Sequence, residues 1–381
     1  MRGGREAVPR TDAIVVGASY AGLAAALQFP GRRVVVFERN ESITHRQRAC
    51  LGVLFGDSEF FEPRGEDLFL RPVRLLVEGG CAGTIERLAV QGQRERAEIS
   101  LSRSWPVANP ERLKGALLRR ARDMGVEVRT GFAVRQLIGD GREVRARGAS
   151  EEAARVLIGA DGTNSLVARW LDPHREALGI LFAREVEFER WTLAPKTLFL
   201  QCLGVGHFLA ALPGTDRHYA WMLHVVGPKG VPLDLDSALQ DSVERLGGGR
   251  ITAAREAVTR LFAPASLSRR DNVLLAGDAV ASFGISGIGA AVAMGALAGR
   301  AANRYLSGSR YALPDYHRRW RRVTRQATVE RVLWAQPLLA RLDPDRVDSL
   351  LRAMKGRRRS SVIPAGDIVA RLPAMLLGLF L

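Results

Sequence analysis

A glycine-rich hexapeptide near the start of the chain has the residue types and the spacing that bind a diphosphate. Residues 17–22 read G-A-S-Y-A-G, which is the G-x-G-x-x-G pattern with Ser19 at the second glycine. That position needs a small side chain because the backbone must approach the phosphates closely. Serine meets this need, and we expect its hydroxyl to donate to a phosphate. The candidate residues of this turn are Gly17, Ala18, Ser19, Ala21 and Gly22.

A carboxylate follows at the distance expected of a ribose-binding acid. Glu38 stands 21 residues after Gly17, at the end of an apolar run. An acid at this place accepts hydrogen bonds from ribose hydroxyls. Arg39 comes directly after it and joins the candidates. The pattern predicts a dinucleotide site and leaves NAD and FAD open.

The turn needs a strand before it and a helix after it, and the sequence supplies both. Residues 12–17 form a β-branched run, and residues 18–29 form an Ala/Leu-rich helical stretch that Pro30-Gly31 stops. A second buried strand is expected at 33–38. A strand–helix–strand unit predicts a parallel sheet, with the helix N-terminus directed at the diphosphate.

The pattern changes further along the chain. An amphipathic helix is expected at 111–125, with short strands at 126–130 and 155–160. The segment from about 180 to 226 alternates like the strands of an antiparallel sheet. A buried strand returns at 273–276, and a helix of small residues follows at about 288–304. We therefore expect two domains that share the chain discontinuously.

Two further strings separate FAD from NAD. Residues 154–169 read ARVLIGADGTNSLVAR, and residues 272–294 read NVLLAGDAVASFGISGIGAAVAM. The first resembles the Asp-Gly motif, at Asp161-Gly162, of the FAD-dependent superfamily of aromatic hydroxylases and geranylgeranyl reductases. The second is similar to the Gly-Asp motif of the same superfamily, at Gly277-Asp278. The resemblance implies FAD as the cofactor and NAD(P)H or another reductant as the source of electrons.

The resemblance also implies where the flavin half lies. Asp278 would accept from a ribityl hydroxyl. Gly287, Ile288 and Gly289 would open a helix toward the flavin pyrimidine edge, where negative charge develops on reduction.

The adenine end matches the superfamily less closely. Residues 131–134 resemble the segment whose backbone meets adenine, which makes Val134 a candidate. The superfamily places an arginine before the helix at 111–125, and this chain has Pro110 there. Arg103 and Arg112 are the candidates to replace it.

The predicted fold class follows from the resemblance. It is α/β: a Rossmann-type FAD-binding domain with an inserted antiparallel-sheet substrate domain, as in para-hydroxybenzoate hydroxylase, and a C-terminal helical tail. The FAD-binding domain is expected at 1–75, 100–175 and 265–310, and the substrate-binding sheet at 76–99 and 176–264. The remaining residues, 311–381, form a basic, helical region with an apolar end.

The substrate residues are predicted by resemblance to the reductases. Cys50 lies where those enzymes have a Cys-Gly-rich turn, and Tyr219 and Trp221 resemble their Y-x-W segment. These three residues are the candidates for the catalytic and substrate pocket. A buried structural thiol and ordinary core aromatics are the alternative interpretation.

The residues after Gly277-Asp278 narrow the reaction. Hydroxylases of the superfamily carry a His and a Pro there, and both are absent from residues 279–285. The leading hypothesis is a reductase that saturates C=C bonds of an apolar isoprenoid or terpenoid substrate by hydride transfer from reduced flavin. A monooxygenase that epoxidises or hydroxylates a terpenoid or an aromatic through a flavin hydroperoxide is the alternative. A flavin-bound membrane electron carrier is an alternative of another class.

Halogenation is not expected. Flavin-dependent halogenases share the fold and depend on a lysine between the first acid and the substrate sheet. Lys114 alone lies in that interval, and the amphipathic pattern places it on the surface of its helix.

The charge of the chain argues against nucleic acid as a partner. The net charge is +16, but four of the 56 basic residues are lysines and the rest are arginines. Such a bias indicates coding composition, because phosphate-backbone binders use both residues.

Residues 317–381 hold 14 basic and 5 acidic residues. Residues 357–381 join an arginine cluster to an apolar end, which suggests an anchor on an anionic membrane surface; a helix that covers the core or a partner subunit is the alternative.

The cysteine content and the start of the sequence indicate in which cellular compartment the protein lies. Three cysteines without metal-type spacing indicate a reducing environment and no metal site. The start of the sequence lacks the apolar run of a signal peptide. We expect a cytoplasmic protein, at most peripheral at a membrane, and the oligomeric state stays open.

Overall fold

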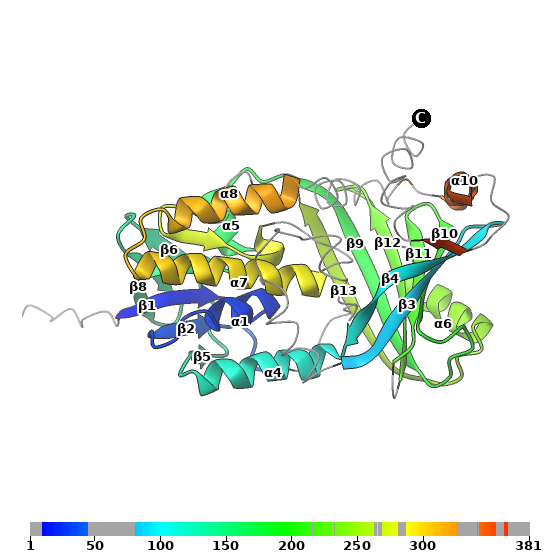
Figure 1. Cartoon of the computed structure of the whole chain (residues 1–381), viewed down its shortest axis with the longest axis horizontal. Helices are drawn as coiled ribbons and strands as arrows, with labels where there is room; N and C mark the ends of the chain where they lie inside the picture. The colour runs from blue at the N-terminus through cyan, green and yellow to red at the C-terminus, as the bar shows by residue number, and fades with distance from the viewer. Residues whose placement is uncertain are drawn as a thin grey trace, which may run out of the picture.

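Two sheets lie side by side in the computed structural model (Figure 1). The first carries helices on its faces, and the second carries a helix on the side away from the first (Figure 1). The structure describes residues 10–44, 81–214, 217–231, 233–262, 265, 269–280, 287–325, 341, 343–355 and 362–364.

The first sheet is built around a parallel core. Its strand order is β14-β15-β8-β1-β2-β5, and all of these neighbours are parallel except β14 and β15. The central strands are short apolar runs that are buried because layers cover both faces of a parallel sheet. The strands are β1 (Arg10–Val16), β2 (Val34–Phe37), β5 (Glu127–Arg129), β8 (Glu151–Gly159), β14 (Arg269–Arg270) and β15 (Val273–Leu275).

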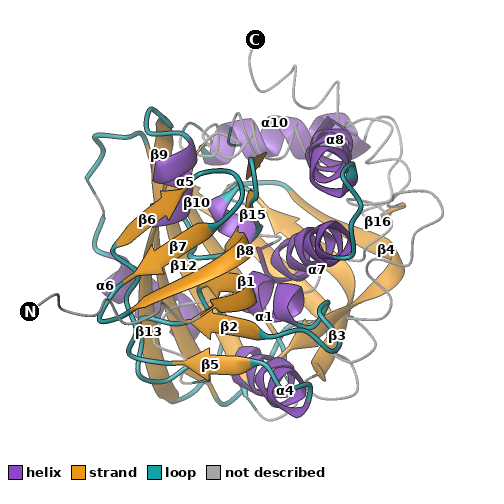
Figure 2. Cartoon of the chain, turned by 90° about the vertical axis from the view of Figure 1, so that its left-hand side faces the viewer, coloured by secondary structure: helices purple, strands orange, loops and turns teal. Residues whose placement is uncertain are grey.

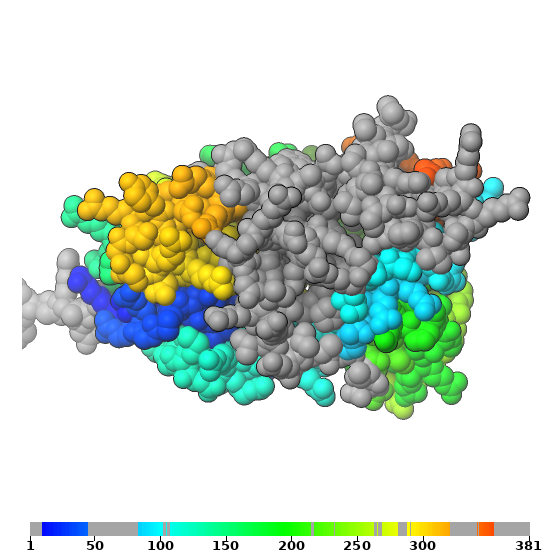
Figure 3. All heavy atoms as spheres, in the orientation of Figure 1, coloured from blue at the N-terminus to red at the C-terminus, as the bar shows by residue number. Residues whose placement is uncertain are grey.

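Helices α1, α4, α7 and α8 pack around this sheet (Figure 2). Figure 3 shows α7 and α8, in yellow and orange, beside the blue surface of α1. The first helix is shorter than the predicted 18–29: it ends at Ala26, since Phe29 precedes a proline and is disfavoured in a helix. The helices of this domain are α1 (Tyr20–Ala26), α4 (Pro110–Asp123), α5 (Leu166–Leu171), α7 (Gly287–Leu306) and α8 (Ala312–Arg325).

The second sheet is mixed rather than purely antiparallel as predicted. Its order is β13-β9-β12-β11-β10-β3-β4-β16, with parallel pairs at β10·β3 and β16·β4. Its strands are β3 (Cys81–Gln91), β4 (Arg96–Ala108), β9 (Ala177–Phe188), β10 (Thr197–Gly204), β11 (His207–Leu212), β12 (His218–Val226), β13 (Ile251–Phe262) and β16 (Val362–Pro364). Helix α6 (Leu235–Arg245) covers one face through Leu239 and Val243.

Two expected boundaries need correction. Residues 100–108 belong to the second sheet, because β4 pairs with β3 as far as Ala108. Within the region 311–381, the described residues are part of both domains rather than a separate helical tail. Helix α8 buries Tyr316 and Trp320 in the core of the first domain, and β16 is a strand of the second sheet.

A further helix of the C-terminal region also packs on the second sheet. Helix α10 (Pro344–Lys355) places Val347 and Leu351 in a cluster with Ile99 and Cys202. The buried Asp348 accepts hydrogen bonds from the backbone of Arg94 at 2.9 Å. Part of the predicted basic tail therefore completes the core.

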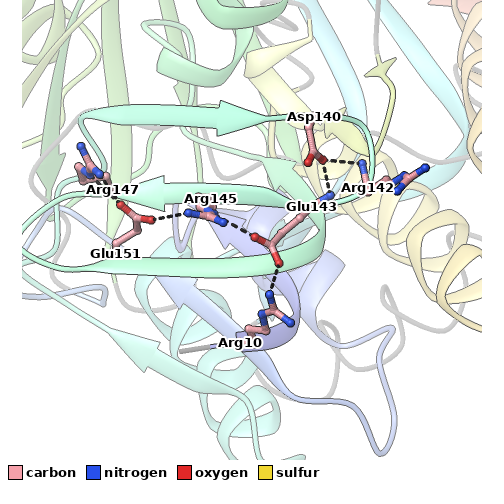
Figure 4. Close-up of polar contacts among 7 residues, drawn as sticks. All are labelled: Arg10, Asp140, Arg142, Glu143, Arg145, Arg147 and Glu151. Carbon is pink, nitrogen blue, oxygen red and sulfur yellow. Dashed lines mark hydrogen bonds and ion pairs between the residues drawn. The ribbon is translucent and has the colours of Figure 1, made fainter. Parts of the chain in front are cut away.

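A chain of ion pairs crosses the exposed hairpin of the first sheet, formed by β6 (Gln136–Gly139) and β7 (Val144–Arg147) (Figure 4). Glu143 pairs with Arg10 at 3.3 Å and with Arg145 at 2.9 Å; Glu151 then pairs with Arg147 at 2.6 Å. Arginines here are matched by carboxylates, so they do not form an unpaired basic patch.

Candidate functional site

A cavity of about 470 Å³ opens where the carboxyl ends of β1, β2 and β8 meet the start of α4. Its size lies in the range of about 300–1,000 Å³ for small-molecule sites. The residues that line it come from five segments of the chain. They are Val16, Gly17, Ser19, Tyr20, Phe37, Glu38, Arg39, Asn40, Ser42, Ile43, Thr44, Pro110, Glu111, Lys114, Phe132, Ala133, Val134, Ala160, Asp161, Gly162, Asn164, Leu166 and Arg169.

The predicted diphosphate turn forms one wall of this cavity. Gly17 has φ +98°, and a Cβ added to it would lie 2.5 Å from the Ala160 carbonyl oxygen. A Cβ on Gly22 would lie 1.9 Å from the Gly17 oxygen. Both positions therefore require glycine. The turn brings the N-terminus of α1 against the cavity, with Ala18 and Ala21 buried behind it.

Ser19 caps the helix rather than offering its proton to the cavity. Its hydroxyl accepts from the backbone N–H of Gly22 at 3.1 Å, which is the N-cap interaction that starts α1. The same hydroxyl donates to the Ala160 carbonyl at 2.9 Å. The expectation that Ser19 supplies a phosphate donor is wrong for this arrangement, because its hydroxyl already donates its hydrogen bond to the Ala160 carbonyl, directly after β8. Its small size still permits the close approach.

Glu38 lies directly after β2 and is 9% exposed. One carboxylate oxygen accepts from the backbone N–H of Ala18 at 2.9 Å. The other accepts from the backbone and side-chain nitrogens of Asn40, at 2.9 Å and 2.7 Å. These donors hold the acid at the mouth of the turn, so it is placed to accept from a ribose. Sequence reasoning missed Asn40, which carries no motif of its own.

Aromatic side chains form the next part of the wall. Phe132 stacks on Phe37 with ring centroids 4.3 Å apart. The Phe132 backbone N–H donates to the Glu38 carbonyl at 2.8 Å, which ties this loop to the end of β2. Val134 lines the cavity beside them and Arg39 is exposed at its rim, as candidates of an adenine and ribose end.

Asp161 closes the cavity from the end of β8. Its carboxylate accepts from the Ser165 hydroxyl at 2.5 Å and from the backbone N–H of Leu166 at 2.7 Å. Burial raises the pKa of Asp161, and these hydrogen bonds act in the opposite direction. Ser165 is the N-cap of α5, and the Asp161 carboxylate accepts from the N–H groups of the first turn at Leu166 and Val167, which fixes the loop that carries Gly162.

Lys114 is the cation that α4 directs to the cavity. It is half-buried, lines the cavity, and holds its ammonium 5.4 Å from the centre of the Tyr20 ring. The predicted surface position of Lys114 is therefore wrong. Arg112 is exposed on the same helix and does not line the cavity. Arg103 lies in β4 of the second sheet, and its side chain is outside the part that the structure describes. The amphipathic pattern did not reveal this position of Lys114. A residue at the border between the apolar and polar faces of a helix can contact either solvent or a neighbouring element, and the pattern does not distinguish the two.

The second predicted group lies in a separate place, along the next strand of the sheet. Gly277 and Asp278 form a short 3₁₀ turn directly after β15, and Gly287, Ile288 and Gly289 open α7. Gly277, Asp278, Ile288 and Gly289 do not line the cavity at the diphosphate turn. Ile288 is buried in the core of the first domain. Their contact with a flavin remains a prediction.

Tyr219 and Trp221 lie together on β12, as their spacing predicts. Their rings stack with centroids 5.9 Å apart. They belong to an apolar cluster on the face of the second sheet away from α6, and this face looks toward the first domain (Figure 1). Their role toward a substrate remains a prediction. Cys50 lies outside the described residues.

Charged residues border this apolar face. The buried Glu185 accepts from the indole N–H of Trp221 at 2.6 Å and pairs with Arg255 at 3.3 Å. Burial lowers the pKa of Arg255, but the hydrogen bond that Arg255 donates to Glu187 and the charges of Glu187, Glu185 and Glu111 outweigh it and raise the pKa. Glu111 begins α4, so Arg255 faces the first domain. Sequence reasoning missed this group, since alternating charges on a strand also fit a solvated face.

The arrangement fits the adenosine diphosphate half of a dinucleotide. The glycine turn leaves room that a Cβ would fill, Glu38 is fixed at its mouth, and Lys114 brings positive charge. Fold and site together define a Rossmann-type dinucleotide-binding protein. The profile of the family described as "FAD binding domain" matches residues 10–226, which is more than half of the chain. The chain belongs to this FAD-binding family.

Solved structures with the same fold come from several enzyme classes. A geranylgeranyl bacteriochlorophyll reductase-like protein from Thermoplasma acidophilum has a TM-score of 0.79 at 15% identity, over 98% of this chain and 99% of that one. The p-nitrophenol 4-monooxygenase of Pseudomonas putida has a TM-score of 0.72 at 17% identity, over 98% and 99%. A flavin-dependent brominase has 0.67 at 17% identity, over 97% and 94%. No curated protein sequence matches the chain.

Two further observations concern the described residues. None of their His, Cys, Asp and Glu side chains gather in a group of three that could hold a metal ion. Among the helices in this part of the chain, none combines the length and apolar character that crossing a bilayer requires.

Proposed function

We propose that this protein is an FAD-dependent reductase that saturates C=C bonds of an apolar, isoprenoid or terpenoid substrate. The observation that carries the proposal is the apolar face of the second sheet that looks toward the first domain. Its buried members are Ile85, Val107, Leu198, Ala210, Leu212 and Trp221, with Leu88, Leu101, Leu200, Tyr219 and Leu223 packed against them.

The residues of the first domain would hold the cofactor. Bound FAD would supply hydride transfer from its flavin ring. Lys114 and the backbone of the turn at Gly17 and Ser19 would hold the diphosphate, Glu38 the adenosine ribose, and Asp278 the ribityl chain. The apolar face would orient the substrate and keep water away from the reacting carbons.

The turn after β15 favours a reductase over a hydroxylase. The positions after Asp278 carry Ala279 and Val280, and both side chains are fully buried. A histidine that serves hydroxylation chemistry is absent from this segment of the sequence, 279–285. The similarity to a geranylgeranyl reductase-like fold over nearly the whole of both chains supports the same choice.

A monooxygenase acting on a terpenoid or an aromatic is the second candidate, favoured by the similarity to p-nitrophenol 4-monooxygenase. Anaerobic turnover separates the two. The purified, FAD-loaded protein is reduced with dithionite without oxygen and mixed with geranylgeranyl diphosphate or farnesol. A reductase gives a product two hydrogens heavier, detected by mass spectrometry. A product that forms in air alone and carries labelled oxygen would establish the monooxygenase instead.

Three further proposals go with this function. NAD(P)H or another reductant supplies the electrons in the cell, and the protein is cytoplasmic and peripheral at a membrane. Residues 357–381 would meet anionic headgroups, since three consecutive arginines precede the apolar end. A protein that reoxidises rapidly with a quinone analogue and converts no organic substrate would support the electron-carrier alternative.

A further inference from the structure

Arg175 occupies the joint between the two domains. It lies between the end of α5 at Leu171 and the start of β9 at Ala177, where the chain leaves the first sheet for the second. The return path runs close by, because Phe262, the last residue of β13, pairs with Ala177 in the register of the second sheet. The two chain segments that connect the first sheet with the second therefore run close together at Arg175.

The guanidinium of Arg175 binds the turn after β15. Nη1 donates to the Ala279 carbonyl and Nη2 to the Val280 carbonyl, each at 2.8 Å. The Val280 carbonyl also accepts from the backbone N–H of Ala265 at 2.7 Å. The carbonyls at the end of the Gly277–Ala279 turn are thus held by one planar side chain and by the chain that returns from β13.

The guanidinium also packs over an aromatic ring. Its central carbon lies 4.9 Å from the centre of the Phe262 ring. Desolvation lowers the pKa of Arg175 to about 10, while the charges of Asp172 and Asp278 act to raise it. The side chain is therefore a charged group kept in a largely dry place, and Asp278 is near enough to act on it.

An arginine suits this place better than a lysine. Its five N–H donors form a fixed planar fork that can serve two acceptors at once and stack on a ring. A lysine ammonium carries the same charge but does not impose this plane. The geometry is typical of a group that sets the position of a backbone segment.

We infer that Arg175 is a positioning residue for the flavin half of the FAD site, and that it joins the entry and exit strands of the second sheet to the Gly277–Asp278 turn. The inference rests on the proposed placement of the ribityl chain at Asp278. Arg175 acts through the carbonyls of Ala279 and Val280. The adenosine diphosphate cavity, lined by Gly17, Glu38 and Phe132, does not include Arg175.

The separation of these two regions allows a sharp experiment. Apoprotein of the full chain is prepared as wild type, Arg175→Ala, Arg175→Lys and the control Arg184→Ala. Arg184 lies in β9, the strand that follows Arg175, and its side chain pairs with Asp236 and Glu256. FAD affinity is measured by fluorescence quenching and ADP affinity by calorimetry. The visible spectrum and circular dichroism of the bound flavin are recorded as well.

We expect Arg175→Ala to weaken FAD about tenfold or more, as for loss of a charged hydrogen-bond donor, and to change ADP affinity by less than about twofold. Arg175→Lys should lie between Arg175→Ala and wild type, with an altered flavin dichroism. Added guanidinium at non-denaturing concentration should restore FAD affinity to Arg175→Ala. Arg184→Ala should match wild type in both affinities.

Two results would overturn the inference. One is unchanged FAD affinity and dichroism in both Arg175 variants. The other is parallel loss of FAD and ADP affinity without guanidinium rescue, which would mark a general structural role. Failure of the proposed function would look different: the wild-type protein would bind FAD but give no product two hydrogens heavier in the anaerobic assay, and the Arg175 variants would still differ from it in FAD affinity.

Discussion

The indole N–H of Trp221 donates to the buried carboxylate of Glu185 at 2.6 Å, across the neighbouring strands β12 and β9. The two residues are directly opposite in the register, and Arg255 continues the row on β13. The polar edge of Trp221 is therefore used within the sheet. The apolar ring of Trp221, which stacks on Tyr219, is the part that remains for the proposed substrate contact.

Trp221→Phe is expected to destabilise the protein. It leaves one oxygen of a fully buried carboxylate without its donor, which costs about 1–3 kcal/mol. Chemical denaturation monitored by circular dichroism measures the change. Trp191→Phe is the control, because its indole donates at 3.1 Å to a backbone carbonyl in a part-buried loop; its loss should be smaller. Trp221→Phe is also made in a Glu185→Gln background. If it lowers the free energy of unfolding equally in both backgrounds, the hydrogen bond between Trp221 and Glu185 contributes nothing to stability.

Gly17→Val is expected to abolish FAD binding. The residue has φ +98°, and a Cβ there would lie 2.5 Å from the Ala160 oxygen. A branched side chain would also fill the cavity wall. The visible flavin absorbance of the purified protein is the measurement. Gly227→Ala is the matched control, since nothing lies within 4 Å of a Cβ at that position. A yellow Gly17→Val protein would refute the assignment of the turn.

The sequence predicted the first sheet and its turn well, for a physical reason. β1, α1 and β2 are local in the chain, and their buried β-branched runs and capping serine specify them without distant partners. Gly17 and Glu38 were predicted from the strand–turn–helix–strand pattern and Asp161 from the resemblance, and the structure places all three around one cavity, where parallel strands end. The class of cofactor came from ordered motifs and agrees with the family match.

The rest depended on contacts that no local pattern encodes. β16 joins β4 from more than 250 residues away, and its three residues give no strand signal of their own. Arg175 is one arginine among many, and its role appears only when α5, β13 and the Gly277 turn meet. Lys114 differs from Arg112 by two positions on one helix, and packing against Tyr20 decides which one lines the cavity.

Lys114→Met is expected to weaken both FAD and ADP. The ammonium lines the cavity beside the diphosphate turn, so its loss removes an attraction to the phosphates of about 1.5–3 kcal/mol, or about 10–150-fold in affinity. The dependence of affinity on salt should become shallower. Arg112→Met, on the exposed side of the same helix, should leave both affinities near wild type. If the two variants behave alike, Lys114 does not meet the diphosphate.

Stability is expected to fall as the pH drops through the histidine range. Burial lowers the pKa of His207, His218 and His224 in the folded protein, and the charge of His224 adds to the effect at His207. The unfolded chain, with pKa near 6.5, then binds more protons, so stability is complete above about pH 6.5 and declines below it. Thermal unfolding from about pH 8 to pH 5 measures this. His207→Phe should flatten the profile, while the exposed His174→Gln should not; a wild-type profile flat over this range would contradict the prediction.

Neutralising the arginines at 357–359 is expected to weaken binding to anionic vesicles without loss of FAD. Each arginine near an anionic surface contributes about 1 kcal/mol, so three glutamines should lower partitioning about 100-fold. Removing the whole of 357–381 would confound this test, because β16 within it pairs with β4 in the second sheet. Truncation after Pro364 keeps that strand and removes the apolar end.

Cosedimentation with phosphatidylserine vesicles, against phosphatidylcholine vesicles, measures both variants beside wild type. Electrostatic loss in the glutamine variant should vanish at high salt, whereas loss in the truncated chain should persist, because apolar burial is not screened. Binding of the glutamine variant at wild-type strength would mean that these arginines do not meet a membrane.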